Sequence, residues 1–193
     1  LLVVGGGYIG LEAAAVARKL GLAVTLIELA PRILGRVAAP ETADYFRALH
    51  RGHGVEVLEG TGLTRLVGDG AVSGAILSDG RRIACDAVIA GIGVAPDTPL
   101  AEAAGLTLDN GIATDATGRT DDPHIWAAGD CASFATATGR MRLESVQNAI
   151  DMAETVAANI LGAGAPYVPQ PWFWSDQYDL KLQIAGLNTG YDH

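Results

Sequence analysis

A glycine pattern near the N-terminal end constrains the fold of this chain more than any other feature. Gly5, Gly7 and Gly10 form the pattern G-x-G-x-x-G, which follows four apolar residues and precedes apolar residues at helical spacing over 8–20. An apolar strand, a glycine turn and a helix in this order are typical of the first β-α-β unit of a dinucleotide-binding domain. In such a unit the first glycine permits the tight turn, the second lets a pyrophosphate approach the backbone, and the third lets the helix pack on the strand. A glycine-rich turn with a purely structural role is the alternative.

The second strand of this unit ends on an acidic residue. Residues 23–28 form a short apolar run, and Glu28 lies 18 residues after Gly10, close to the spacing of about 20 at which a carboxylate accepts the ribose hydroxyls of NAD. A 2′-phosphate beside this carboxylate would be repelled, so we expect NADH to be preferred over NADPH. Arg32 and Arg36 follow soon after and could instead turn toward a phosphate.

A second glycine pair follows a later apolar strand. Residues 86–90 are expected to form a buried strand, which ends in Gly91, Ile92 and Gly93. Because ligands bind at the carboxyl ends of the strands in open α/β sheets, this turn is a further candidate for the nucleotide site. A β-bulge or an ordinary tight turn would explain the same glycines.

The composition agrees with a globular α/β protein and excludes several classes. Of the 193 residues, 49% are apolar and 18% are charged, and the formal net charge is −9. The acidic balance disfavours a general nucleic-acid binder, and the sequence contains neither a membrane-spanning apolar run nor a signal peptide. Cys85 and Cys131 form neither a disulfide framework nor a metal-ligand pattern. We therefore expect a soluble, cytoplasmic protein.

The remaining periodicity predicts a Rossmann-like dinucleotide-binding domain, in which a β-meander accompanies a parallel sheet. Asp79 and Gly80 indicate a hairpin turn, and the segment 162–171, with three prolines and two glycines, reads as a linker. The chain opens inside an apolar strand without an initiator Met, so we interpret it as the middle of a longer protein. The other predicted elements are helices over 40–52, around 100–104 and over 145–161, and strands over 55–58, 63–67, 72–77, 82–84, 125–128 and 180–187.

Six motifs together resemble one family. They are GGGYIGLE (5–12), VTLIE (24–28), VIAGIG (88–93), IWAAGDCA (125–132), ESVQNA (144–149) and PWFWSDQ (171–177). They resemble the flavoprotein NADH:ferredoxin reductases of bacterial cytochrome P450 and aromatic-ring dioxygenase systems, which belong to the glutathione-reductase-like FAD/NAD(P) oxidoreductases. The resemblance implies an NAD(H)-binding domain over 1–111, the C-terminal segment of an FAD-binding domain over 112–165, and the start of a C-terminal domain over 166–193.

The resemblance also implies roles for single residues. Glu12 is expected to hold the nicotinamide carboxamide and Tyr8 to cover the flavin, and both are expected to be catalytic. Asp130, with Gly129, is expected to hold the ribityl chain of FAD. The helix that begins at Ser145 is expected to direct the N–H groups of its first turn at the flavin ring. The full set of expected cofactor-binding residues is Gly5, Gly7, Tyr8, Ile9, Gly10, Glu12, Glu28, Arg36, Gly91, Ile92, Gly93, Gly129, Asp130, Glu144, Ser145, Val146, Gln147 and Trp172.

The reaction implied by the resemblance is hydride transfer from NADH to FAD, followed by electron transfer to a [2Fe–2S] ferredoxin. Neither nucleic acid nor a membrane is an expected partner, and the intact enzyme is expected to be a monomer or a homodimer. Arg140 and Arg142 are candidates for a basic patch that docks the ferredoxin. The alternatives are an NAD(P)H-dependent thiol or peroxide oxidoreductase of the same fold and a redox protein like apoptosis-inducing factor.

Overall fold

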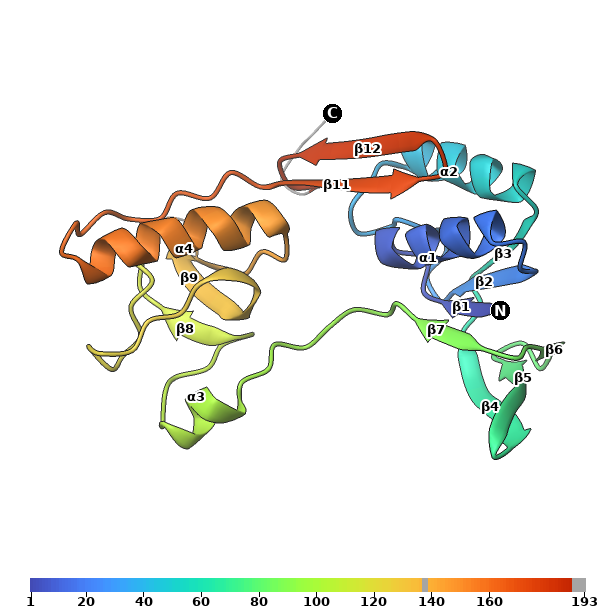
Figure 1. Ribbon diagram of the computed structural model, residues 1–193, viewed down its shortest axis with the longest axis horizontal. Helices are drawn as coiled ribbons and strands as arrows, with labels where there is room; N and C mark the ends of the chain where they lie inside the picture. Colours follow the sequence, from blue (N-terminus) through green and yellow to red (C-terminus); the bar gives the residue numbers. More distant parts are fainter. Residues whose placement is uncertain (137–138, 189–193) are drawn as a thin grey trace. The chain divides into compact units, whose positions relative to one another are not determined.

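The computed structural model describes residues 1–136 and 139–188, and the chain divides into two compact units (Figure 1). Unit 1 comprises residues 1–93 and 174–182 together with 187–188, and unit 2 comprises the described residues of 94–173 and 183–186. In the part of the chain that the structure describes, no helix has both the length and the apolar character needed to cross a membrane.

Unit 1 contains a four-stranded parallel sheet in the order β3-β2-β1-β7. Its strands are β1 (Leu2–Val4), β2 (Val24–Glu28), β3 (Val55–Glu59) and β7 (Val88–Ala90). Val4 at the end of β1 pairs with Ile27 on one side and with Ala90 on the other. The carboxyl ends of three strands therefore meet at one edge, where the two glycine turns and Glu28 follow.

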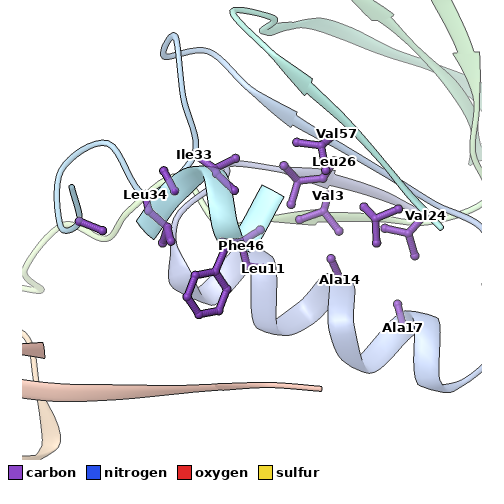
Figure 2. Packing of buried hydrophobic residues seen from close by; sticks show 13 residues of the cluster. Val3, Leu11, Ala14, Ala17, Val24, Leu26, Ile33, Leu34, Phe46 and Val57 are labelled. Carbon is purple, nitrogen blue, oxygen red and sulfur yellow. The ribbon is translucent and has the colours of Figure 1, made fainter. Parts of the chain in front are cut away.

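Two helices cover one face of this sheet (Figure 2). They are α1 (Tyr8–Lys19) and α2 (Pro40–Gly52), whose predicted limits agree closely with the structure. Leu11 and Ala14 of α1 point toward Val3 of β1 and Leu26 of β2 (Figure 2), and all four side chains are fully buried. Because successive side chains of a strand alternate between faces, the neighbouring residues of β1 and β2 face the opposite side.

The opposite face packs against the predicted meander, which consists of β4 (Leu63–Asp69), β5 (Ala71–Leu77) and β6 (Arg82–Ala84). Its strands are antiparallel, and Leu2, Ile27 and Leu77 lie in the shared core. Asp79 and Gly80 form the predicted hairpin turn between β5 and β6. The Rossmann-like α/β class with a parallel sheet and a meander is thereby confirmed.

Unit 2 contains a three-stranded sheet in the order β10-β9-β8. Its elements are α3 (Pro99–Ala103), β8 (Ile112–Thr114), the 3₁₀ turn η1 (Gly129–Cys131), β9 (Ala132–Thr136), β10 (Gly139–Met141) and α4 (Val146–Ile160). Phe134 and Met152 are fully buried, and the ring of Tyr167 meets that of Phe134 edge to face at 5.2 Å between centroids. A further strand pair, β11 (Trp172–Gln177) and β12 (Leu180–Ala185), follows the predicted linker.

The strand predicted over 125–128 is wrong. Only Trp126 of this segment forms an isolated bridge, and its partner is Arg119 in a turn. The N–H of Ala127 then bonds to the carbonyl oxygen of Gly118, and the chain bends at Gly129, where φ is +76°. The segment is apolar because Ala127 packs in the core of unit 2. Its single bridge, to Arg119, is too short to make it a strand.

Candidate cofactor-binding sites

The three glycines of the N-terminal turn occupy different environments, as a pyrophosphate cradle requires. A Cβ at Gly10 would lie 2.0 Å from the carbonyl oxygen of Gly5, and a Cβ at Gly5 would lie 2.3 Å from that of Gly91. Gly5 also has φ of +107°, a conformation that favours glycine. A Cβ at Gly7, by contrast, would meet no atom within 4 Å. The outer glycines thus allow backbone to pack on backbone, while the surface at Gly7 is open for a ligand at the N-terminus of α1.

Glu28 is held beside this turn by two backbone N–H groups. Its Oε2 accepts from the N–H of Gly6 at 2.6 Å, and its Oε1 accepts from that of Ala30 at 2.7 Å. These bonds fix the carboxylate at the carboxyl end of β2, next to the glycine turn. Each oxygen of a carboxylate has a second lone pair, so the group still has acceptor capacity for two ribose hydroxyls.

The loop after β2 is tied back to the same place. The N–H of Leu34 donates to the carbonyl oxygen of Gly6 at 2.9 Å. The guanidinium of Arg32 donates to the carbonyl oxygens of Ala38 and Gly35 in its own loop, at 2.8 and 3.3 Å. Arg36 is exposed. Arg32 therefore stabilises the loop, and Arg36 is the cation of this segment with an exposed side chain.

The base of this loop is anchored by Glu59 at the end of β3. Its carboxylate accepts from the N–H of Ile33 at 2.8 Å and forms an ion pair with Arg47 of α2 at 2.6 Å. Partial burial raises the pKa of Glu59, but the hydrogen bonds from Arg47 and Ile33 outweigh it, so the pKa lies below its usual range. Glu59 and Arg47 were not identified from the sequence, because nothing in a strand-end glutamate distinguishes a loop anchor from a solvated residue.

The second glycine turn lies beside the first. The N–H of Gly91 donates to the carbonyl oxygen of Val4 at 2.8 Å, and Gly93 has φ of +106°. Ile92 between them is 72% exposed, and Ile9 on the first turn of α1 is 54% exposed. Both turns of unit 1 thus contribute apolar side chains at the edge of the sheet where Glu28 lies.

Tyr8 and Glu12 lie one turn apart on α1. Tyr8 is the first residue of the helix and packs against the main core of unit 1. The Oε1 of Glu12 accepts a hydrogen bond of 2.6 Å from the hydroxyl of Ser175, which is fully buried in β11. Ser175 was not predicted from the sequence, since no local pattern connects residues 163 positions apart.

In unit 2 the expected flavin ligands gather around η1 and the N-terminus of α4. Gly129 adopts a left-handed conformation and Asp130 is exposed. The guanidinium of Arg142 donates to the carbonyl oxygen of Asp130 at 3.0 Å and pairs with the carboxylate of Glu144. Arg142 thereby connects the turn that carries Asp130 with the residue that precedes the cap of α4.

The N-terminus of α4 is well defined. The hydroxyl of Ser145 accepts from the N–H of Asn148 at 3.2 Å, so Ser145 is the N-cap, and the helix begins one residue later than expected, at Val146. The N–H groups of Val146 and Gln147 have no acceptor within the helix, and the side chain of Val146 is 58% exposed. These N–H groups can therefore donate to an anionic group, and the positive end of the helix dipole favours negative charge at the same place.

Trp172 lies at a hollow in unit 2. The hollow has a volume of about 430 Å³ and is lined by Gln147, Asp151, Gln170, Pro171, Trp172 and Ala185. The amide of Gln147 donates to Asp151 at 2.6 Å across its wall. Trp172 and Gln147, both expected flavin ligands, thus line one concave surface.

The structure does not favour a docking patch at Arg140 and Arg142. The guanidinium of Arg140 donates to the carbonyl oxygens of Thr114 and Ser133 in the sheet of unit 2. The side chain of Arg142 is only 11% exposed, and its bonds are to the turn beside Asp130. Arg140 also forms an ion pair with Asp109 at 3.7 Å, and its side chain remains 32% exposed, so both cations are engaged by groups of their own unit.

Comparisons with known proteins show the family to which the chain belongs. Residues 1–153 match the model of the pyridine nucleotide-disulphide oxidoreductase family, and residues 172–193 match a reductase C-terminal model. A ferredoxin–NAD(P)+ reductase from Sphingomonas sp. is 49% identical over 197 residues, which cover 100% of this chain and 48% of that protein.

Two solved structures are also similar. A ferredoxin reductase from Rhodopseudomonas palustris has a TM-score of 0.95 at 49% identity, and a covalent putidaredoxin reductase–putidaredoxin complex has 0.93 at 44%. Each match covers 100% of this chain and 48% or 47% of the matched chain, so the chain spans about half the length of these relatives.

The left-handed turn at Gly129, the exposed Asp130 and the capped helix end at Ser145 fit a flavin, and the open backbone at Gly7 fits a pyrophosphate. The family of the matching model implies FAD and a pyridine nucleotide as cofactors. The chain belongs to the pyridine nucleotide-disulphide oxidoreductase family.

Proposed function

We propose that this chain is part of an FAD-dependent NADH:ferredoxin oxidoreductase that supplies a [2Fe–2S] ferredoxin of an oxygenase system. The observation that carries the proposal is the arrangement at the edge of the parallel sheet, where an open glycine turn, a helix N-terminus and the fixed carboxylate of Glu28 lie together. The similarity to ferredoxin reductases at 44–49% identity supports the choice among the reactions of this family.

Unit 1 binds the nucleotide in this proposal. The backbone around Gly7 and the first turn of α1 hold the pyrophosphate, and Glu28 accepts from the ribose hydroxyls. Glu12 accepts from the carboxamide of the nicotinamide, which orients the ring for hydride transfer. Tyr8 covers the position that the nicotinamide takes when NADH binds.

Unit 2 contributes to flavin binding. Asp130 accepts from a ribityl hydroxyl, and the N–H groups of Val146 and Gln147 donate toward the ring, where they stabilise negative charge. FAD supplies the chemistry that couples a two-electron donor to a one-electron acceptor. The residues of this chain therefore bind and orient, and the cofactor carries the electrons.

A thiol or peroxide oxidoreductase is the second candidate from the sequence, and nothing in the described residues favours it. Cys85 is buried under the meander and Cys131 donates to the carbonyl oxygen of Ala128 at 3.5 Å. Both are free thiols, and they belong to different units of the chain.

Stopped-flow spectroscopy of the FAD-loaded protein that contains this chain tests the proposal. We expect NADH to bleach the flavin absorbance and an added [2Fe–2S] ferredoxin to be reduced with multiple turnovers. The Asp130→Ala variant is expected to lose FAD, whereas Asp109→Ala, an exposed acid of the same unit, is expected to retain it. Turnover with disulfides or peroxide but not with ferredoxin would contradict the proposal.

A further inference from the structure

A buried chain of hydrogen bonds leads from Glu12 into the interior of unit 1. Ser175 donates to Glu12 at 2.6 Å, and the amide nitrogen of Gln177 donates to the hydroxyl of Ser175 at 3.0 Å. The amide oxygen of Gln177 lies 2.8 Å from Nε2 of His50, and the hydroxyl of Tyr178 lies 3.2 Å from its Nδ1. Ser175, Gln177 and His50 are each 0% exposed. The series connects α1, β11 and α2, all of which belong to unit 1 in the residues concerned (Figure 1).

The ionised carboxylate determines the direction of every bond in this series. Glu12 can only accept, so Ser175 must use its single hydrogen on Glu12 and accept from an N–H of Gln177. The oxygen of the Gln177 amide then faces His50, whose Nε2 must carry the proton in order to donate. Nδ1 of a neutral imidazole is an acceptor, which suits the hydroxyl of Tyr178.

All donors in the series therefore point toward Glu12. Hydrogen bonds arranged head to tail polarise one another, and their effect is greatest where water is excluded. Burial lowers the pKa of His50, despite the opposing hydrogen bond to Gln177, and so favours the neutral ring that this arrangement needs. One oxygen of the Glu12 carboxylate is consequently fixed by the hydroxyl of Ser175. The oxygen of this hydroxyl cannot move away without leaving a buried amide N–H of Gln177 unpaired.

We propose that Ser175, held by Gln177 and His50, is a positioning residue that orients the Glu12 carboxylate for the carboxamide of the nicotinamide. The inference rests on the proposed function, because it takes Glu12 as the ligand of the carboxamide. Since Ser175 lies on β11 and Glu12 on α1, correct recognition of the nicotinamide depends on the packing of residues 174–178 against the nucleotide-binding unit. We expect recognition of the adenosine half not to depend on it, because Glu28 is held by the N–H groups of Gly6 and Ala30, which are not part of this series.

Isothermal titration calorimetry of the 193-residue chain with NADH and with ADP-ribose separates these two contributions. ADP-ribose contains the adenosine, both phosphates and the ribose, but no nicotinamide. We expect Ser175→Ala to raise the Kd for NADH about tenfold, equivalent to about 1.4 kcal/mol, and to leave the Kd for ADP-ribose within a factor of about two. Gln177→Met keeps the side-chain volume and removes both the N–H that donates to Ser175 and the oxygen that accepts from His50. It is expected to weaken NADH binding by a smaller factor in the same selective way.

Two controls make the outcome decisive. Asp176→Ala changes an exposed residue between Ser175 and Gln177 and is expected to alter neither Kd. Glu12→Ala is expected to weaken NADH binding at least as much as Ser175→Ala. The double variant with both substitutions is expected to bind NADH as tightly as Glu12→Ala alone. If Glu12→Ala weakens NADH binding while Ser175→Ala and Gln177→Met leave it unchanged, the positioning role is overturned and the proposed function survives. If Glu12→Ala has no effect, the proposed role of Glu12 fails first.

Discussion

Glu28 offers the most direct test of nucleotide choice. Its carboxylate is fixed by the N–H groups of Gly6 and Ala30 at 2.6 and 2.7 Å, so its charge cannot swing away from a nucleotide at the glycine turn. A 2′-phosphate about 4 Å from a carboxylate is repelled by about 4 kcal/mol at an effective dielectric constant of about 20. Two N–H donors offset part of that charge, and we therefore expect NADH to bind about 100-fold to 1,000-fold more tightly than NADPH.

Glu28→Gln removes the charge and keeps one acceptor oxygen. The amide nitrogen must then face one of the two backbone N–H groups, and the buried N–H of Gly6 is the costlier one to leave unpaired. We expect the free energy of unfolding to fall by about 1–3 kcal/mol and the preference for NADH over NADPH to shrink at least tenfold. Calorimetric titration with both nucleotides and urea unfolding measure the two effects.

Glu56→Gln is the matched control for this test. It makes the same change in net charge on the neighbouring strand β3, where Glu56 accepts from Thr25 at the other end of the register. It is expected to leave the ratio of the two dissociation constants unchanged. Equal affinity of the unsubstituted chain for NADH and NADPH would refute the reasoning, because it would show that Glu28 does not face the ribose.

Three further predictions follow from buried contacts. Burial depresses the pKa of His50 below its ordinary value of about 6.5, so the unfolded chain binds the proton first and the free energy of unfolding should fall as pH drops below about 6.5; urea unfolding at pH 7.5 and 5.5 should show this, and His50→Gln should flatten the dependence. Gly10→Ala should abolish ADP-ribose binding in calorimetry, because the new Cβ would lie 2.0 Å from the carbonyl oxygen of Gly5; retained affinity would argue against the cradle. Arg140→Glu should lower the free energy of unfolding by about 2 kcal/mol or more, since its guanidinium donates to the carbonyl oxygen of Thr114. An unchanged urea midpoint would show that this bond does not stabilise the fold.

Local elements were largely predictable because their signals are local. The helix after Gly7, the helix that begins at Pro40 and the cap at Ser145 all lie within one or two residues of the expected limits. A glycine turn between an apolar strand and an amphipathic helix, an N-cap serine and an Asp-Gly hairpin each act over fewer than ten residues. Those residues are contiguous in the sequence, so their pattern is visible without the fold.

Apolar runs predicted strands less reliably, because a strand forms only where a neighbouring segment pairs with it. The segment 125–128 has the composition of a strand, yet the described chain supplies only Arg119 as a bridge partner for it. From the sequence, Arg140 was likewise expected to be a surface charge. Only the folded structure shows that its guanidinium donates to backbone carbonyl oxygens. A sequence states which side chains are apolar or charged, but the availability of a partner is a property of the packed molecule.

The sequence by itself predicted the glycine turn and the acid beside it, because Gly5, Gly7, Gly10 and Glu28 belong to one β-α-β unit whose geometry is nearly invariant. Tertiary structure alone decided how Glu12 is held. Its partner Ser175 lies 163 positions away, and His50 and Gln177 lie 127 apart. A buried polar side chain must find a partner wherever the fold places one, and neither periodicity nor spacing encodes which residue that will be.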